Sequence, residues 1–512
     1  MNRRSFLQSV AVGSAGMAAA PGRAAADPGG AAAAGRTPAT PAPRPPNLLF
    51  LWTDQHRGDT VPWAGNTALQ ANEFFAPLGE RSFVFHDAHV TQPVCTPSRA
   101  SILTGLWPHN HGATTNNLRL RPDLRCLAEY LPSNYECGYF GKWHLGDENS
   151  AQHGFREWRA IEDGYRQHYS VPAERKRLSG YHHFLLAHGF PPDAADPEVD
   201  TTPLFSRTMA AALPERYTKV SYLADEAVRF LRARRDGRPF ALLVNSLEPH
   251  PPMYGPLNGR HDPAALPVGP AFMRPPGPEA SQLCRRHDEK LQAEGFKHHP
   301  FKTEADFRRL RANYYGLVSL VDRAYARVMR ALEESGQADN TIVVYTSDHG
   351  ELLGDHRLMQ KSQFYTAATH VPLAIQVPWL ARHRVDLRGP ISLVDLLPTL
   401  LELMGVAPPA GIDGRSRAGA LREPGTWRPE DIVVEWNDAE HAAQSGRSLV
   451  AADGWKLNLW RDDAPELFDL NRDPGELRNL AREADQRDRR RRMADQLRAW
   501  QTRTRDALPL TV

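Results

Sequence analysis

The chain has 512 residues, a length that allows two to three structural units at roughly 150 residues each. Its 62 Lys and Arg residues against 60 Asp and Glu residues give no electrostatic reason to expect a nucleic acid or an anionic membrane as a partner. A hydrophobic content of 41% is typical of a packed globular protein and excludes a long disordered chain. Any preference for anionic ligands must therefore be local.

The first 26 residues differ in composition from the rest of the chain. Arg3 and Arg4 precede Ser-Phe-Leu and a run of small apolar residues, a pattern that resembles a twin-arginine export signal. The run is too short and too rich in Gly and Ala to form a stable membrane span. We expect residues 1–26 to be read by the twin-arginine export machinery and the protein to be periplasmic or secreted. Residues 27–46, rich in Pro, Ala and Gly, are expected to form a disordered linker.

Three short apolar runs, each followed by polar residues, are typical of strands buried in a parallel sheet. They cover residues 47–52, 240–245 and 341–345. Stretches with helical periodicity precede the second and third runs, at 222–232 and 310–335. This alternation predicts an α/β sandwich with a large, mostly parallel central sheet, and such sheets bind ligands at the carboxyl ends of their strands.

Two long segments, residues 160–215 and 251–305, show no sustained periodicity and are rich in Pro, His and charged residues. They predict long surface insertions. Because structureless loops of this length are usually functional, we expect them to hold residues that select the substrate.

The C-terminal part of the chain has a different pattern. After an expected helix on the main sheet at 395–401, short strand-like runs cover 433–436, 448–451 and 456–460, and a charged helix extends from about 485 to 505. The pattern predicts a smaller α+β subdomain with a short antiparallel sheet. We place the catalytic domain at 47–425 and this subdomain at 426–512.

The chain has only four cysteines, too few for a disulfide scaffold. Cys126 and Cys137 either pair or are two buried thiols, because separation in sequence does not say whether their Cα atoms approach each other.

The stretch from 94 to 105, Val-Cys-Thr-Pro-Ser-Arg-Ala-Ser-Ile-Leu-Thr-Gly, places Cys95, Pro97 and Arg99 at a characteristic spacing. It resembles the signature of the formylglycine-dependent sulfatases, a family of the alkaline-phosphatase-like superfamily. Residues 140–146, Phe-Gly-Lys-Trp-His-Leu-Gly, closely resemble a second motif of that family, and 391–399 and 466–474 resemble later landmarks. The resemblance covers nearly the whole chain after the linker. One departure lies at 71–75, where many members read Pro-Asn-Leu-Asp.

The resemblance implies that a separate formylglycine-generating enzyme oxidises Cys95 to Cα-formylglycine. The hydrated aldehyde carries two hydroxyls on one carbon, so one oxygen can attack sulfur and the other can later expel sulfate by re-forming the carbonyl. An ordinary serine would stay sulfated. Such a nucleophile needs a nearby cation that lowers the pKa of its hydroxyl.

The resemblance also implies a metal site after two of the predicted strands. Its ligands would be Asp54 and Gln55, Asp348 and His349, and residue 95 itself. A site rich in oxygen ligands favours one Ca²⁺ ion, with Mg²⁺ or Mn²⁺ as alternatives. Many members have Asp where this chain has Gln55, so Gln55 could bind the metal, contact sulfate or act only as a hydrogen-bonding group at the strand end.

Four further residues match positions from which sulfatases handle the sulfate and its leaving group. In an extended segment, Lys142 and His144 would point to the same side, where Lys142 can hold the sulfate and His144 can transfer a proton. His250 and Lys361 match positions that protonate the leaving oxygen or bind sulfate.

Two polar residues close to Cys95 in the sequence are also candidates for the site. Arg99 is expected to be buried and to brace both the aldehyde hydrate and the metal carboxylates. Asn116 either lines the pocket or caps a helix.

The expected activity is hydrolysis of a sulfated small molecule or saccharide to an alcohol and inorganic sulfate. An alternative from the same superfamily is a phosphonate monoester hydrolase or phosphodiesterase, whose members can also carry Asp-Gln at the first ligand pair. A third hypothesis is a binding protein on an inactivated scaffold. It would lack Cys95, Lys142 or His144, and this chain has all three.

Overall fold

The structure is a computed structural model that describes residues 44–69, 72–190, 212–234, 237–295, 301–438 and 440–512. These residues belong to one compact unit, Thr40–Val512. The expected export signal at 1–26 and the linker up to residue 43 lie outside the described residues, as do 191–211 of the first insertion and 296–300 of the second. Within the described part of the chain, no helix is both long and apolar enough to cross a membrane.

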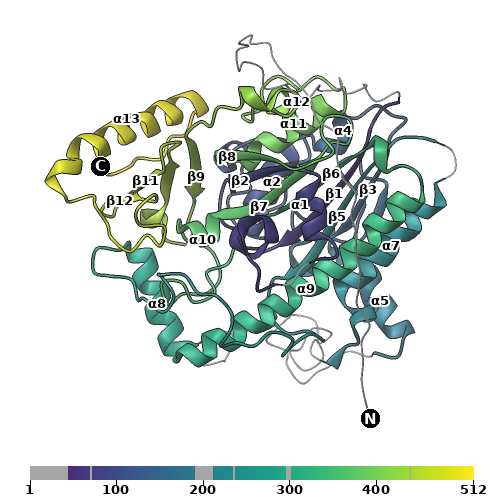
Figure 1. The fold of residues 1–512 in the computed structure, drawn as a ribbon, viewed down its shortest axis with the longest axis horizontal. Coiled ribbons are helices and arrows are strands. Elements are labelled where there is room, and N and C mark those ends of the chain that lie inside the picture. The colour runs from purple at the N-terminus through teal and green to yellow at the C-terminus, as the bar shows by residue number, and fades with distance from the viewer. Residues whose placement is uncertain (1–43, 70–71, 191–211, 235–236, 296–300, 439) are drawn as a thin grey trace, which may run out of the picture. The chain divides into compact units, whose positions relative to one another are not determined.

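One large sheet contains eight strands: β1 (Asn47–Asp54), β2 (Phe83–His89), β3 (Glu136–Gly141), β4 (Glu157–Arg159), β5 (Phe240–Pro249), β6 (Thr341–Ser347), β7 (His370–Gln376) and β8 (Val385–Ser392). Their order across the sheet is β4-β3-β5-β1-β6-β7-β2-β8. Figure 1 labels all of these strands except β4. β1 pairs in parallel with both β5 and β6, and β3 pairs in parallel with β5. β7 is antiparallel to both of its neighbours. The sheet is therefore mostly parallel, as the sequence predicts.

The described helices are α1 (Phe75–Glu80), α2 (Cys95–Thr104), α3 (Pro108–His111), α4 (Leu127–Tyr130), α5 (Gly180–Ala187), α7 (Lys219–Ala233), α8 (Gln282–Glu294), α9 (Glu304–Glu334), α10 (Thr366–Thr369), α11 (Leu396–Leu403), α12 (Ala418–Arg422) and α13 (Arg487–Thr504).

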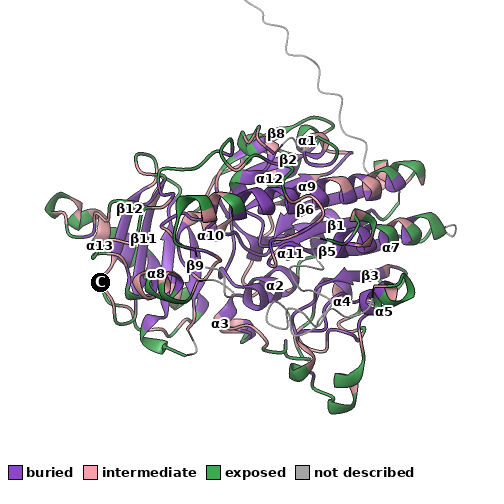
Figure 2. Cartoon of the chain, turned by 90° about the horizontal axis from the view of Figure 1, so that it is seen from below, coloured by how far each residue is buried: buried purple, intermediate pink, exposed green. Residues whose placement is uncertain are grey.

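Helices cover both faces of the large sheet, and the strands are buried between them (Figures 1 and 2). Successive residues of a strand point to opposite faces. In β1, Leu49 and Leu51 pack into a core with α7 and α9, whereas Leu48 and Phe50 pack into a second core with α2 and α11. Burial on both faces explains why β1, β5 and β6 have continuous apolar sequences.

A second, antiparallel sheet contains β9 (Ile432–Trp436), β10 (Gly446–Val450), β11 (Trp455–Trp460) and β12 (Glu466–Asp469), ordered β12-β11-β10-β9. Residues of α13 such as Leu497 pack on one of its faces with Leu457. The other face packs against Val94, the residue before Cys95. The Glu435 backbone N–H also donates to the Thr91 carbonyl oxygen at 2.7 Å. The small sheet therefore supports the loop that leads into α2.

The predicted strands and helices are present, and the fold class is confirmed. The two insertions differ from the prediction, because they contain the helices α5 and α8. Each begins at a serine, Ser179 or Ser281, whose hydroxyl accepts a backbone N–H of the first turn. α8 buries few apolar residues among many charged ones. Its sequence therefore shows only weak apolar periodicity.

Candidate active site

Four adjacent parallel strands bring polar side chains to one edge of the large sheet. Asp54 ends β1, Asp348 follows β6, His250 follows β5 and Lys142 follows β3. Their neighbouring positions in the strand order bring together residues as far apart in the sequence as Asp54 and Asp348. This is the edge at which parallel α/β sheets bind ligands.

Cys95 is the first residue of α2, so the positive end of that helix lies at its side chain. The residue is 1% exposed. Its Sγ lies 3.2 Å from His349 Nε2 and 3.9 Å from both Asp54 Oδ1 and Lys142 Nζ. The pKa of the thiol is lowered: burial and Asp54 raise it, but Lys142, Lys361 and His349 outweigh them. An anionic group at this position is therefore stabilised.

Arg99 forms ion pairs with the carboxylates of Asp54 and Asp348. It lies one helical turn after Cys95 and is fully buried, as predicted. Its Nη2 donates to Asp54 Oδ2 at 2.8 Å and lies 2.7 Å from Asp348 Oδ2, and its Nη1 donates to the Lys142 carbonyl oxygen at 2.7 Å. Nε, Nη1 and Nη2 of Arg99 all donate hydrogen bonds, so the guanidinium group fixes the positions of the Asp54 and Asp348 carboxylates.

The side chains of Asp54, Cys95, Asp348 and His349 form a group that could hold a metal ion. One ligand atom from each lies within 4.8 Å of all the others, and all four residues are buried. His349 Nδ1 lies 2.9 Å from the Gly350 carbonyl oxygen, so Nδ1 carries the proton and Nε2 is left as a ligand. Two carboxylates and an imidazole suit a divalent cation, so the residues present fit the expected metal.

Lys142 is positioned by a close approach between two strands. β3 ends at Gly141, where a Cβ atom would lie 1.8 Å from the Asn245 carbonyl oxygen of β5. Only glycine fits there. The Lys142 side chain is fully buried, and its Nζ lies 2.8 Å from Asp54 Oδ2.

His144 lies in the same pocket, but not for the predicted reason. Its φ is 56°, so the segment is not extended at this residue. The buried carboxylate of Glu148 accepts the backbone N–H groups of Trp143 and His144 at 2.6 and 2.7 Å and turns the chain here. The expected alternation of an extended segment is therefore wrong, and a carboxylate-stabilised turn takes its place.

The imidazole of His144 is held by two residues that the sequence did not single out. Its Nε2 lies 3.0 Å from Asn117 Oδ1, and its ring stacks on Tyr165 with 3.9 Å between centroids. Nε2 therefore carries the proton, and no described residue hydrogen-bonds to the buried Nδ1. Burial lowers the pKa of His144 well below its usual value, with Lys142 and Arg99 adding to the shift. The ring is a neutral base with one free nitrogen.

Gln55 and Lys361 contact each other at the same edge. Lys361 Nζ donates to Gln55 Oε1 at 2.6 Å, and Gln55 Nε2 donates to the buried carboxylate of Glu351. The backbone N–H of Gln55 donates to Asp348 Oδ1 at 3.0 Å. Gln55 is thus a hydrogen-bonding group next to the metal-ligand group.

His250 is half-buried and lies near the same residues. Burial lowers the pKa of its imidazole well below the usual value; Lys361 lowers this pKa further, and Asp54 raises it.

The remaining sequence candidates have structural roles. Asn116 Oδ1 accepts the Thr96 backbone N–H at 3.1 Å, so Asn116 caps the first turn of α2. Cys126 and Cys137 are buried free thiols rather than a disulfide.

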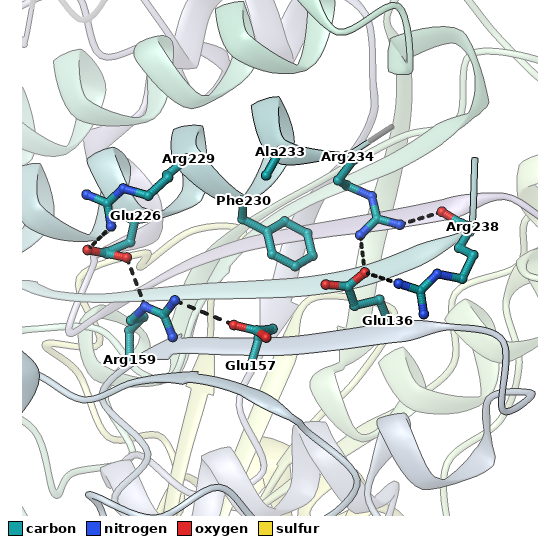
Figure 3. Close-up of a pocket in the computed structure, with 9 residues that line it drawn as sticks. All are labelled: Glu136, Glu157, Arg159, Glu226, Arg229, Phe230, Ala233, Arg234 and Arg238. Atoms are coloured by element: carbon teal, nitrogen blue, oxygen red, sulfur yellow. Dashed lines mark hydrogen bonds and ion pairs between the residues drawn. The ribbon is translucent and has the colours of Figure 1, made fainter. Parts of the chain in front are cut away.

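A surface hollow of about 410 Å³ lies elsewhere on the molecule (Figure 3). Its charged groups are paired with one another, for example Arg159 with Glu226 and Arg234 with Glu136, each at 2.8 Å. Glu136 begins β3, whereas Lys142 follows its other end, about 20 Å away at ~3.3 Å per residue. This hollow is therefore separate from the candidate site.

Three residues of the site were not identified from the sequence, and their positions in the sequence differ in how well they could have indicated a role. Asn117 directly follows Asn116, and Glu351 follows His349 at a spacing of two, so both are neighbours of identified residues. Tyr165 lies in an aperiodic insertion, where nothing in the local pattern indicates a contact with His144.

Comparison with known proteins identifies the family. The sulfatase family model matches residues 46–406, and the model for the C-terminal part of N-sulphoglucosamine sulphohydrolase matches 354–503. The chain is 29% identical over 473 residues to the multifunctional alkaline phosphatase superfamily protein PehA of Trinickia caryophylli, covering 85% of this chain and 91% of that protein. It is 29% identical over 483 residues to the uncharacterized sulfatase YidJ of Escherichia coli, covering 90% of this chain and 88% of that protein.

The solved structure of the phosphonate monoester hydrolase of Agrobacterium radiobacter is also similar. It matches with a TM-score of 0.74 at 25% identity, covering 90% of this chain and 96% of that one. The match of the sulfatase family model to residues 46–406, most of the chain, confirms the resemblance seen in the sequence. The chain belongs to the sulfatase family of the alkaline-phosphatase-like superfamily and is a sulfuric ester hydrolase.

Proposed function

We propose that the cluster around residue 95 hydrolyses a sulfate ester of a small molecule or saccharide, with Cys95 converted to Cα-formylglycine as the nucleophile. One observation carries the proposal. The Cys95 side chain lies at the start of a helix, 3.2 Å from His349 and 3.9 Å from Asp54 and Lys142. An oxygen nucleophile at this position would lie among metal ligands and a sulfate-binding ammonium group.

The metal would be held by Asp54, Asp348, His349 and an oxygen of residue 95, with Gln55 as a further candidate ligand. When bound, a divalent cation there lowers the pKa of a hydroxyl and stabilises negative charge on oxygen. The predominance of hard oxygen donors favours Ca²⁺ over Mg²⁺ and Mn²⁺.

The residues of the chain divide the reaction into two steps. In the first, one hydroxyl of hydrated residue 95 attacks sulfur, with Asp348 as proton acceptor, and the bond between sulfur and the ester oxygen breaks. The departing oxygen takes a proton from His250 or Lys361; because burial lowers the pKa of His250, His250 must first gain a proton in order to act as this acid. In the second step, His144 removes the proton of the remaining hydroxyl, the carbonyl re-forms and sulfate leaves. Lys142 neutralises the sulfate oxygens in both steps.

A phosphonate monoester hydrolase is the second candidate function. It is favoured by the Asp54-Gln55 pair and by the similarity to the phosphonate monoester hydrolase of Agrobacterium radiobacter. Sulfate and phosphoryl groups share a tetrahedral geometry and differ mainly in charge. Lys142 and His144, which match the sulfatase motif, favour the sulfate ester.

Turnover of an aryl sulfate and of a matched aryl phosphonate monoester tests the proposal. We expect a higher kcat/KM for the sulfate, and Cys95→Ala should abolish both activities. A preference of tenfold or more for the phosphonate would assign the second function instead.

Other features extend the proposal to maturation and location. The pattern at 1–26 supports export by the twin-arginine machinery to the periplasm or the medium, after which the mature protein would contain a catalytic domain at 47–425 and a subdomain at 426–512. A formylglycine-generating enzyme is the required partner during maturation.

A further inference from the structure

The amide of Gln55 lies in a buried chain of hydrogen bonds that the proposed reaction does not use. Its Nε2 donates to Glu351 Oε2, and its Oε1 accepts from Lys361 Nζ at 2.6 Å. Gln55 and Glu351 are both fully buried. The Lys361 ammonium is close enough to Cys95 and His349 to affect their pKa values. The chain of hydrogen bonds therefore ends at an ammonium group near Cys95 and His349, and the Gln55 backbone N–H donates to Asp348 Oδ1 at 3.0 Å.

The two partners of Gln55 allow only one orientation of its amide. The oxygen and nitrogen ends of an amide have nearly the same shape but opposite hydrogen-bonding roles. A carboxylate only accepts and an ammonium group only donates. Glu351 must therefore face the NH₂ end, and Lys361 must face the oxygen end. Reversing the amide would place two donors against each other and two acceptors against each other.

Glu351 is itself held in a fixed position. Its Oε1 accepts the backbone N–H groups of Leu353 at 3.0 Å and Gln360 at 2.5 Å. The hydrogen bonds of its carboxylate with the described residues all come from N–H donors, so Glu351 acts only as an acceptor. It also connects the segment after His349 to the segment that carries Lys361.

We propose that Glu351 is a positioning residue: it orients the Gln55 amide so that the carbonyl oxygen faces Lys361 and the metal and sulfate site. The hydrogen bond to Glu351 also explains why position 55 carries an amide. A carboxylate at 55 would face the Glu351 carboxylate with no donor between them. The inference rests on the proposed function, because it assigns an orienting role within that site.

The first test is the variant Glu351→Gln, which keeps the shape but presents either an oxygen or an NH₂ group to Gln55. Loss of a residue that orients a metal-site group typically weakens metal binding or activity about 10- to 100-fold. We expect the Ca²⁺ dissociation constant, measured by equilibrium dialysis, and the KM for an aryl sulfate to rise within that range. Glu466→Gln, which removes another buried carboxylate in the small sheet, is the matched control and should leave both values unchanged.

The second test is an exchange of the two groups, and its readout is the thermal unfolding of metal-free protein. Gln55→Glu alone should lower Tm, because two acceptors then face each other. The double variant Gln55→Glu with Glu351→Gln restores one donor and one acceptor, so it should recover most of the loss. Additive effects of the two substitutions, or wild-type metal binding in Glu351→Gln, would overturn the proposal. A wild-type protein that does not hydrolyse sulfate esters would instead refute the proposed function, and the exchange experiment would still test the orientation.

Discussion

Replacing His144 by alanine should separate the two steps of the reaction. The imidazole is a neutral base whose Nε2 is fixed by Asn117 and whose Nδ1 has no hydrogen-bond partner among the described residues. A positioned base contributes roughly 10² to 10⁴ in rate, or about 3 to 5 kcal/mol of transition-state stabilisation. In the described part of the chain, no hydrogen bond or ion pair joins His144 to Asp54 or Asp348. Metal binding by His144→Ala should therefore equal that of the wild type. The loss should therefore fall on release of sulfate.

Rapid-quench kinetics with an aryl sulfate would measure both steps. We expect His144→Ala to release a burst of phenol equal to the enzyme concentration, followed by slow turnover with covalent sulfate left on residue 95. Asn117→Ala is the matched control. It keeps the base but removes its orienting contact, and should slow release only about 10-fold. Slow phenol release without a burst in His144→Ala would assign this residue to the first step and refute the division of roles.

Four further results follow from the site. Asp348→Asn should lose most bound metal and activity as measured by elemental analysis and turnover, whereas Asp123→Asn, an exposed control, should retain both. Lys142→Ala should slow both steps, so its rapid-quench trace should show no burst. Arg99→Ala removes the Arg99 ion pairs of Asp348 and Asp54 and leaves Asp54 paired only with Lys142, so it should lower the free energy of unfolding of the metal-free protein by about 3 to 5 kcal/mol, measured by denaturant titration. Because burial lowers the pKa of His144, the acid limb of sulfate release should lie below pH 6.5, and a limb at or above that value that disappears in His144→Ala would contradict this.

Much of the fold could be predicted because the central strands are buried on both faces. Continuous apolar runs identify β1, β5 and β6, and the polar residues after them predict the edge at which the site lies. β2 was not predicted, because the polar, partly exposed residues His86 and Asp87 interrupt its apolar sequence. β12 has only four residues, too few to show a period.

The site could be predicted where a short motif holds the chemistry, and not where contacts come from distant segments. Cys95 and Arg99 are one helical turn apart, so their proximity follows from the local sequence. Tyr165 reaches His144 from an insertion without periodicity. The turn at His144 depends on the carboxylate of Glu148, four residues later, a local side-chain contact that a pattern of alternating residues does not reveal.

The chemical state of residue 95 tests the central claim most directly. Protein made with and without a formylglycine-generating enzyme can be digested, and the peptide that contains residue 95 analysed by mass spectrometry alongside aryl sulfate turnover. We expect the peptide from active protein to show loss of sulfur and gain of a carbonyl, and activity to rise in proportion to the converted fraction. Full activity with an unmodified Cys95 thiol would contradict the account.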